Sequence, residues 1–396
     1  MIYNDFKDLS LSRLGFGLMR LPLNEDKTVN KEETFKMVDF AMNHGINYFD
    51  TAYPYHDGES ELTIGELLKR YDRETFYLAT KYPGHQTAES YDPKAIFEDQ
   101  LKKCQVDYFD FYLLHNVCEK SIDTYLDERW NIIPYFLEMK KQGKIKHLGF
   151  STHAGLECLK DFLNKYGDEM EFCQIQFNYI DYTLQYGKEK LDILEKAGIP
   201  VWVMEPIRGG KLAALDDSDL KELGEGSVAS FALRFAAQFP NIKVILSGMS
   251  SFDQMVDNVT TFENYEPLTD KQMNKLLEIA EKMKESVPCT GCRYCTGNCP
   301  MGLEIPKLID AYNDIKVNKS GFTPAMYLQA LPDDKKPTAC VGCGACKSAC
   351  PQNIDIPSIM KELSEFMPTL PDWDAICKER NAKAEEKRLK RMNDSV

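Results

Sequence analysis

Two short blocks of cysteines in the last third of the chain constrain its fold more than any other feature. The spacing CxxCxxCxxxCP occurs between residues 289 and 300, and it returns between residues 340 and 351. Such spacing lets tight turns aim three thiolates at one centre, as a cysteine-ligated iron–sulfur cluster requires. The segment from about residue 289 to residue 351 is therefore predicted to carry two clusters of the [4Fe–4S] type.

The assignment of ligands follows from the proline after each block. In the bacterial ferredoxin pattern, the fourth cysteine precedes a proline and binds the cluster of the other block. The first predicted cluster is bound by Cys289, Cys292, Cys295 and Cys350. The second is bound by Cys340, Cys343, Cys346 and Cys299. A pair of zinc sites is the alternative, and it is disfavoured because zinc sites usually divide four ligands into two separated pairs.

The sequence around these blocks indicates helices. Apolar spacing predicts helices at 305–309, 323–331 and 356–366. The module, placed at 284–370, resembles the α-helical ferredoxin of fumarate reductase and heterodisulfide reductase subunits. That resemblance implies an electron-transfer module. The charged residues after it predict a C-terminal tail at 371–396.

The scattered cysteines, the N-terminal segment and the net charge indicate the cellular compartment and disfavour two classes of partner. Of the 13 cysteines, those outside the blocks are scattered and are expected to be small buried side chains: Cys104, Cys118, Cys158, Cys173 and Cys377. The N-terminus lacks the basic and apolar regions of a signal peptide, and no apolar run is long enough to cross a bilayer. A net charge of −14 disfavours binding to nucleic acid or to an anionic membrane. We expect a cytoplasmic protein with neither partner.

Residues 1–283 alternate short apolar runs with amphipathic stretches. Strands are predicted at 14–17, 47–50, 76–81, 109–115, 146–150, 172–176, 201–205 and 243–247. Helices are predicted at 32–43, 61–70, 94–104, 130–141, 156–165, 189–197, 227–238 and 252–260. This pattern predicts an α/β chain, in which a (β/α)₈ TIM barrel is followed by a small, mainly α-helical ferredoxin-like domain. An open doubly wound sheet is disfavoured because no GxGxxG follows the first strand.

Three ionisable residues end successive apolar runs of the predicted barrel. Asp50 ends INYFD, Lys81 ends FYLATK and His115 ends FDFYLLH, while Tyr55 lies on the loop after Asp50. Barrel enzymes carry their chemistry at these carboxyl ends of strands. A lone residue of this kind is usually a cap or a surface group, but four together predict a catalytic site.

The same stretches resemble the aldo-keto reductase family. The matching segments are LGFGLMRLP, FDTAYPYHDGESELTIG, ATK, LLH, GFST, QIQFNY, MEPIRGG and SGMSSFDQMVDN. The resemblance implies reduction of an aldehyde or ketone by NADPH or NADH, with Asp50, Tyr55, Lys81 and His115 as the catalytic tetrad. Tyr55 is the expected proton donor, its pKa lowered by a Lys81 cation held by Asp50. His115 is expected to orient the carbonyl.

The cofactor side departs from the family pattern. The resemblance places cofactor contacts at Gly17, Ser151, Thr152, Gln174, Met204, Gly248, Ser250, Gln254 and Asn258. Thr152 replaces a usual asparagine, Met204 stands where an aromatic ring often stacks, and Gln254 stands where an arginine often binds the 2′-phosphate. The choice between NADPH and NADH stays open, and ordinary turn and cap hydrogen bonds are the alternative role for Ser151 and Ser250.

Joining the two modules leaves three hypotheses, because a cluster passes single electrons whereas nicotinamide passes a hydride. In the first, the barrel is a nicotinamide-dependent carbonyl reductase with an appended electron conduit. In the second, an external ferredoxin or other carrier feeds electrons through the clusters to a flavin or to the substrate. In the third, the chain is a non-enzymatic nucleotide-binding redox sensor, which four intact tetrad residues argue against.

Overall fold

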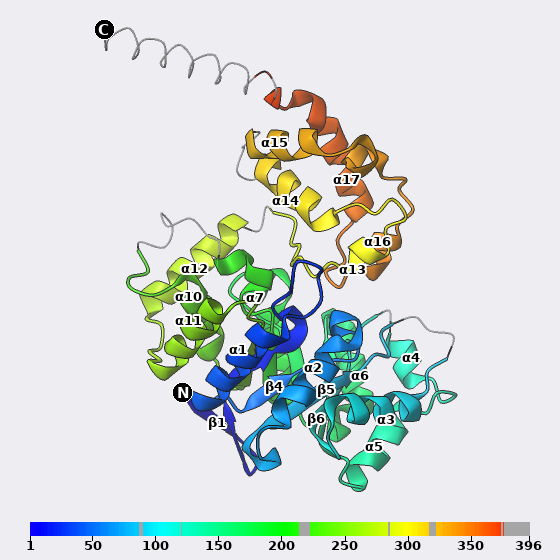
Figure 1. Cartoon of the computed structure of the whole chain (residues 1–396), viewed down its shortest axis with the longest axis vertical. Coiled ribbons are helices and arrows are strands. Elements are labelled where there is room, and N and C mark those ends of the chain that lie inside the picture. Colours follow the sequence, from blue (N-terminus) through cyan, green and yellow to red (C-terminus); the bar gives the residue numbers. More distant parts are fainter. Residues whose placement is uncertain are drawn as a thin grey trace. The chain divides into compact units, whose positions relative to one another are not determined.

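The chain divides into two compact units, both drawn in Figure 1. The computed structural model describes residues 1–86, 90–119, 121–213, 222–283, 286–316, 322–373 and 375. The first unit runs from Met1 to Ala280, and the second begins at Glu281. Cys377 and the predicted tail from residue 376 onward lie outside the described residues.

The first unit is built around a closed barrel of parallel strands. These are β3 (Leu14–Gly17), β4 (Tyr48–Asp50), β5 (Tyr77–Tyr82), β6 (Phe109–Leu114), β7 (Ile145–Thr152), β8 (Cys173–Gln176), β9 (Val201–Met204) and β10 (Ile242–Ser247). Adjacent strands follow the chain order from β3 to β10, and β10 pairs with β3 to complete the circle. The predicted (β/α)₈ barrel is confirmed, and the open doubly wound alternative was wrong because the sheet has no open edge at β3 and β10.

Helices separate the strands and cover the barrel (Figure 1). They are α1 (Lys31–Asn43), α2 (Glu59–Leu68), α3 (Pro93–Cys104), α4 (Ile122–Leu126), α5 (Ile132–Lys141), α6 (Leu156–Tyr166), α7 (Asp181–Leu184), α8 (Gly187–Lys196), α10 (Val228–Ala237), α11 (Phe252–Glu263) and α12 (Asp270–Met283). Side-chain caps mark where some of these helices begin. The Asn30 side chain accepts the Glu33 N–H at the start of α1, and the Asp92 side chain accepts the Ala95 N–H at the start of α3, which begins at Pro93. Each of the eight predicted barrel helices overlaps one of these elements.

A hairpin that the sequence analysis did not predict precedes the barrel. Strands β1 (Tyr3–Phe6) and β2 (Leu9–Ser12) pair antiparallel. Phe6 meets Trp202 of β9 edge-on at 5.1 Å between ring centroids, and Leu11 is fully buried in the same apolar cluster. The hairpin therefore adds its own side chains to the barrel core.

The described part of the second unit is helical and contains no strand. Its helices are α13 (Tyr294–Gly297), α14 (Ile305–Lys316), α15 (Phe322–Ala330), α16 (Ala345–Ala349) and α17 (Ile356–Phe366). Leu308, Met360 and Leu363 are fully buried in a core that also includes four of the block cysteines. The prediction of a small helical domain is confirmed.

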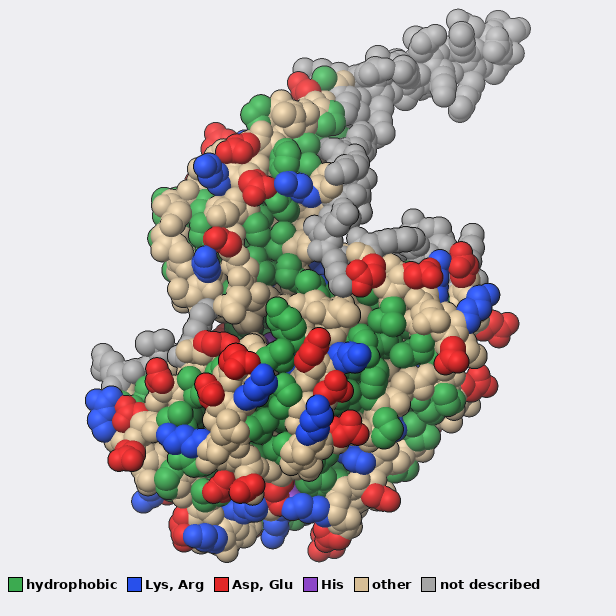
Figure 2. All heavy atoms as spheres, turned by 180° about the vertical axis from the view of Figure 1, so that it is seen from behind, with side chains coloured by type: hydrophobic (Ala, Val, Ile, Leu, Met, Phe, Trp, Pro, Cys, Tyr) green, Lys and Arg blue, Asp and Glu red, His purple; other side chains and the backbone are tan. Residues whose placement is uncertain are grey.

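The surface mixes charges of both signs. Figure 2 shows acidic and basic side chains interspersed over the face in view, with apolar side chains between them. In the described part of the chain, every helix is too short or too polar to cross a bilayer.

Candidate functional site

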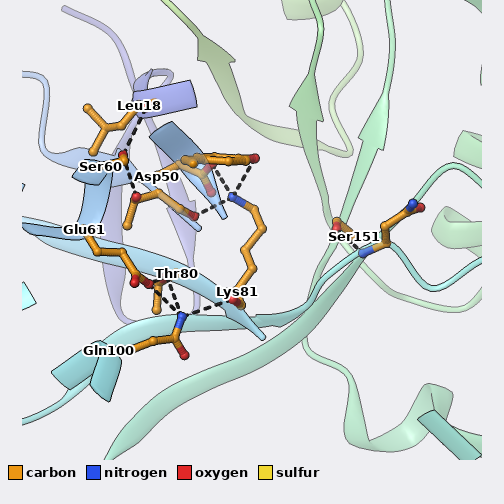
Figure 3. A network of polar contacts seen from close by, with 11 residues as sticks. Leu18, Asp50, Ser60, Glu61, Thr80, Lys81, Gln100 and Ser151 are labelled. Carbon is orange, nitrogen blue, oxygen red and sulfur yellow. Dashed lines mark hydrogen bonds and ion pairs between the residues drawn. The ribbon is translucent and has the colours of Figure 1, made fainter. Parts of the chain in front are cut away.

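The four residues predicted as a catalytic tetrad meet at the carboxyl ends of neighbouring strands. Lys81 Nζ donates to Asp50 Oδ1 at 2.5 Å and to the Thr51 carbonyl oxygen at 2.7 Å. It lies 3.4 Å from the Tyr55 hydroxyl oxygen. The His115 ring meets the Tyr55 ring edge-on, with centroids 5.9 Å apart. Figure 3 shows the Lys81 side chain reaching toward Asp50.

The choice between two nearby tyrosines follows from their contacts. Tyr55 begins the 3₁₀ turn η2 (Tyr55–Gly58), in which His56 and Asp57 take left-handed backbone angles. The Leu21 N–H donates to His56 Nε2 at 3.1 Å, which ties this turn to the loop after β3. Tyr53 instead faces Lys103, whose Nζ lies 4.0 Å from the centroid of its ring. Only Tyr55 of the two reaches Lys81 in the described contacts.

Burial governs the electrostatics of the ion pair. Lys81 is fully buried and Asp50 is 3% exposed. Loss of hydration raises the pKa of the Asp50 carboxyl and lowers the pKa of the Lys81 ammonium, while the attraction between them opposes both shifts. A buried ion pair is strongly destabilised when one partner is removed, so each residue depends on the other.

A second polar network supports the strand that carries Lys81 (Figure 3). Thr80 Oγ1 donates to Glu61 Oε1 at 2.6 Å, and Gln100 Nε2 donates to the same oxygen at 2.7 Å. Gln100 Nε2 also donates to the Lys81 carbonyl oxygen at 3.1 Å. Burial raises the pKa of Glu61, although these hydrogen bonds favour its charged form. Helices α2 and α3 thus fix the backbone of Lys81 from the side opposite its amine.

Two of the residues predicted to contact nicotinamide lie side by side. Ser151 on β7 and Gln174 on β8 are paired in register. Ser151 Oγ accepts the Asn116 N–H at 2.8 Å, so its own proton can still be donated. Gln174 is 2% exposed, and its side-chain oxygen has no partner among the described residues. A buried amide oxygen of this kind is suited to a ligand N–H.

Other predicted cofactor residues hold their own loops together. Thr152 Oγ1 donates to the Val117 carbonyl oxygen at 2.6 Å. Gln254 Oε1 accepts the Ser250 N–H at 2.8 Å, and Asn258 Nδ2 donates to Ser247 Oγ at 2.9 Å. These contacts agree with the turn and cap alternative for this loop.

The remaining predicted cofactor residues line strand ends. Gly17 ends β3 and Met204 ends β9. A side chain at Gly248 would lie 3.3 Å from Arg20 Cβ, so the loop after β10 and the loop after β3 are in close contact. Ser250 Oγ also donates to the Arg20 carbonyl oxygen at 2.8 Å.

Two histidines that the sequence analysis did not single out stand beside His115. His85 lies in the loop after β5, and its ring centroid is 4.3 Å from that of His115. His153 directly follows β7, and a positive charge on its ring would lower the pKa of His115. The signal that could have found them is their position, since each lies within three residues of a barrel strand end.

In the second unit, the block cysteines line two separate cavities. One is lined by Cys289, Cys292, Cys295 and Cys350 together with Pro306, Ile309 and Gln352. The other is lined by Cys299, Cys340, Cys343 and Cys346 together with Leu303, Val341 and Met360. Each cavity therefore combines three cysteines of one block with the last cysteine of the other block.

The two cysteine loops share an unusual backbone. Gly291 and Arg293 of the first loop have positive φ, and so do the corresponding Gly342 and Gly344 of the second. A left-handed conformation at a non-glycine residue such as Arg293 is unfavourable by about 1–2 kcal/mol. Arg293 keeps this conformation although it is not glycine, which indicates that the two cysteine loops share one backbone conformation.

Comparison with known families follows this division of the chain. A model described as "Aldo/keto reductase family" matches residues 13–281, which is more than half of the sequence. The chain belongs to the aldo/keto reductase family. It is an oxidoreductase. A model described as "4Fe-4S dicluster domain" matches residues 288–354, which follow the barrel in the sequence.

Similar proteins are reductases and oxidoreductases. An uncharacterized oxidoreductase, YqkF of Bacillus subtilis, is 26% identical over 303 residues, covering 68% of this chain and 92% of its own. The NADH-specific methylglyoxal reductase of Escherichia coli is 26% identical over 226 residues, covering 52% of this chain and 66% of its own. The structure of aldo-keto reductase AKR11C1 from Bacillus halodurans matches with a TM-score of 0.58 at 27% identity, over 70% of this chain and 96% of that chain.

Proposed function

We propose that the barrel reduces a small carbonyl compound with NADH or NADPH, using Asp50, Tyr55, Lys81 and His115. The observation that carries the proposal is the buried Lys81, with its amine 2.5 Å from Asp50 and 3.4 Å from the Tyr55 hydroxyl. A relative named as an NADH-specific methylglyoxal reductase supports a carbonyl substrate.

The proposed chemistry assigns a step to each side chain. A bound nicotinamide supplies the hydride that adds to the carbonyl carbon. Tyr55 gives its hydroxyl proton to the carbonyl oxygen, so the product is the alcohol and the phenolate left behind lies beside Lys81 Nζ. Asp50 keeps that ammonium in place, and a ring nitrogen of His115 donates a hydrogen bond that orients the carbonyl.

Two features support a nicotinamide at this mouth. The orphaned Gln174 oxygen can accept an N–H of the carboxamide, and the Ser151 hydroxyl can donate to its oxygen. Met204 ends the strand after Gln174 and supplies a polarizable side chain for the ring face. These contacts are the same for NADPH and NADH, which share the nicotinamide ring and its carboxamide.

For the second unit, we propose two [4Fe–4S] clusters with crossed ligands. Each cavity offers the four thiols that one cubane cluster needs. The clusters would carry single electrons for the barrel. The domain that holds them is placed at residues 284–370.

A second candidate function follows from the same cavities. Electrons from an external ferredoxin or another carrier would pass through the clusters to a flavin or directly to the substrate. Reduction of a carbonyl to an alcohol takes two electrons and two protons, so two successive electrons from the carrier, with two protons from solvent, would replace the hydride, and this function needs no nicotinamide.

An anaerobic reduction experiment separates the two candidates. The purified protein is assayed for iron, sulfide, flavin and nicotinamide content, and then mixed with NADH or NADPH and methylglyoxal. The first candidate predicts nicotinamide oxidation that requires the carbonyl. Bleaching of the clusters by nicotinamide alone would connect barrel and clusters in one electron path. Substrate reduction that runs with reduced ferredoxin but with neither nicotinamide would support the second candidate and contradict the first.

Changing Gln254 to Arg is expected to shift the enzyme toward NADPH. Gln254 is the third residue of α11, and its side chain already contacts Ser250, so a guanidinium at this position could bind a 2′-phosphate bidentately. A charge-assisted contact of about 1.5–3 kcal/mol corresponds to about a 10- to 150-fold rise in the NADPH-to-NADH ratio of kcat/KM. Gln254→Lys is the matched variant, because its single charge should give a smaller shift. An unchanged ratio in both variants would contradict the placement of the phosphate at this loop.

A further inference from the structure

Three histidines follow three neighbouring strands of the barrel. His85 comes three residues after β5, while His115 and His153 come directly after β6 and β7. Because β5, β6 and β7 are adjacent, the three side chains start from the same rim of the barrel. The proposed mechanism uses His115 alone and leaves its two neighbours without a role.

His85 is held close to the reacting centre by its loop. A side chain at the preceding Gly84 would lie 2.7 Å from the ring of Tyr125, so the turn packs tightly on that tyrosine. The Tyr125 hydroxyl donates to the His115 carbonyl oxygen at 2.8 Å and also contacts the Tyr82 carbonyl oxygen at 3.2 Å. One tyrosine thus fixes the backbone beside both histidines, and their rings lie 4.3 Å apart.

Both rings keep an unused nitrogen. Nδ1 of His85 and Nδ1 of His115 are buried and have no hydrogen-bond partner among the described residues. His115 is 8% exposed. Leaving a buried polar atom without a partner is unfavourable, so such atoms in native sites usually await a ligand or a water.

The imidazoles bring no positive charge at neutral pH. Burial lowers the pKa of His85 to about 4 and that of His153 to about 3. Burial, together with His85, Lys81 and His153, lowers the pKa of His115 well below its usual value. Among the other charged groups facing them, Lys81 is paired with Asp50, and burial also lowers the pKa of Lys190.

We propose that His85 is a substrate-binding residue that recognises a hydroxyl group on the carbon next to the carbonyl, which makes the substrate a neutral α-hydroxy ketone or α-hydroxy aldehyde. This inference rests on the proposed carbonyl reduction and names its substrate class. Tyr55 and His115 bind the carbonyl oxygen, and the adjacent His85 ring faces the neighbouring oxygen. A neutral imidazole can pair with a hydroxyl, whereas a carboxylate at this position finds no cation on these rings.

The test compares three ketones of similar size. Hydroxyacetone, acetone and pyruvate are assayed with the full-length enzyme, loaded with clusters, under anaerobic conditions. Hydroxyacetone should exceed acetone about 10- to 100-fold in kcat/KM, since an analogue without the hydroxyl leaves a buried nitrogen unpaired. In His85→Phe this ratio should fall at least about tenfold. His85→Gln keeps polar atoms and should retain an intermediate ratio, which provides a second variant if the phenylalanine disturbs folding.

His44→Phe is the matched control. His44 caps α1 and pairs with Glu263 at the surface, away from the strand ends that carry the tetrad, so its ratio should stay at the wild-type value. Equal kcat/KM for hydroxyacetone and acetone, or an unchanged ratio in both His85 variants, would overturn the inference. Preferred reduction of pyruvate would also overturn it, in favour of a carboxylate site. If the enzyme reduces none of these three ketones and does not reduce methylglyoxal either, the proposed function itself is overturned.

Discussion

Replacing Tyr55 with phenylalanine is expected to lower carbonyl reduction about 100- to 10,000-fold, the range associated with loss of a general acid. The hydroxyl is the group that lies 3.4 Å from Lys81 Nζ, and the substitution removes only this oxygen. The ring remains to pack against His115. Steady-state kcat for methylglyoxal or hydroxyacetone measures the effect, and an unchanged circular dichroism spectrum and thermal unfolding midpoint show that the variant is otherwise intact.

Tyr53→Phe provides the control for this substitution. Tyr53 precedes Tyr55 by two residues, but its ring is covered by Lys103. The control should therefore keep the wild-type kcat. Loss of activity in Tyr53→Phe with retention in Tyr55→Phe would reverse the assignment of the acid. Retention in both variants would mean that the proton comes from another group.

The barrel was predictable because its strands are buried on both faces. All residues of β6 are buried, and such a strand appears in the sequence as an uninterrupted apolar run that ends at a polar residue. Asp50, Lys81 and His115 were found as the polar residues at those ends. Their convergence follows from the parallel order of the strands alone, since parallel carboxyl ends share one rim.

The N-terminal hairpin was not predictable from the same pattern. Its strands contain Asn4, Asp5 and Ser10, and only Phe6, Leu11 and Ser12 are buried. A two-stranded hairpin of this length is not stable alone, so its formation depends on the barrel core that receives Phe6. Sequence periodicity over four residues carries too little signal to predict that contact.

The histidines beside His115 were missed for a different reason. A lone histidine in a loop has no local pattern, and its surroundings depend on how the loop folds. Gly84 and Tyr125, which are far apart in the sequence, set the position of His85. The same limit applies to Gln254, because the sequence cannot show that its amide is already hydrogen-bonded to Ser250.

Removing Cys350 is expected to abolish the cluster of the first block, although Cys350 belongs to the second. The cavity that Cys350 lines also contains Cys289, Cys292 and Cys295. Cys350→Ala should therefore lose one of the two cubane clusters, seen as a loss of about half of the protein-bound iron and sulfide. Cys158→Ala, which removes a thiol of helix α6 in the barrel, should leave the iron content unchanged.

Double variants decide whether the ligands are crossed, since single variants lose one cluster under either connectivity. With crossed ligands, Cys350→Ala combined with Cys295→Ala damages the same cluster twice, so the second cluster should survive with its full spin intensity in the reduced state. Cys350→Ala combined with Cys346→Ala damages both clusters, because Cys346 lines the other cavity with Cys299. Little or no cubane signal should remain. Ligands confined to their own blocks would give the reverse result, with the Cys346 combination keeping one cluster and the Cys295 combination losing both.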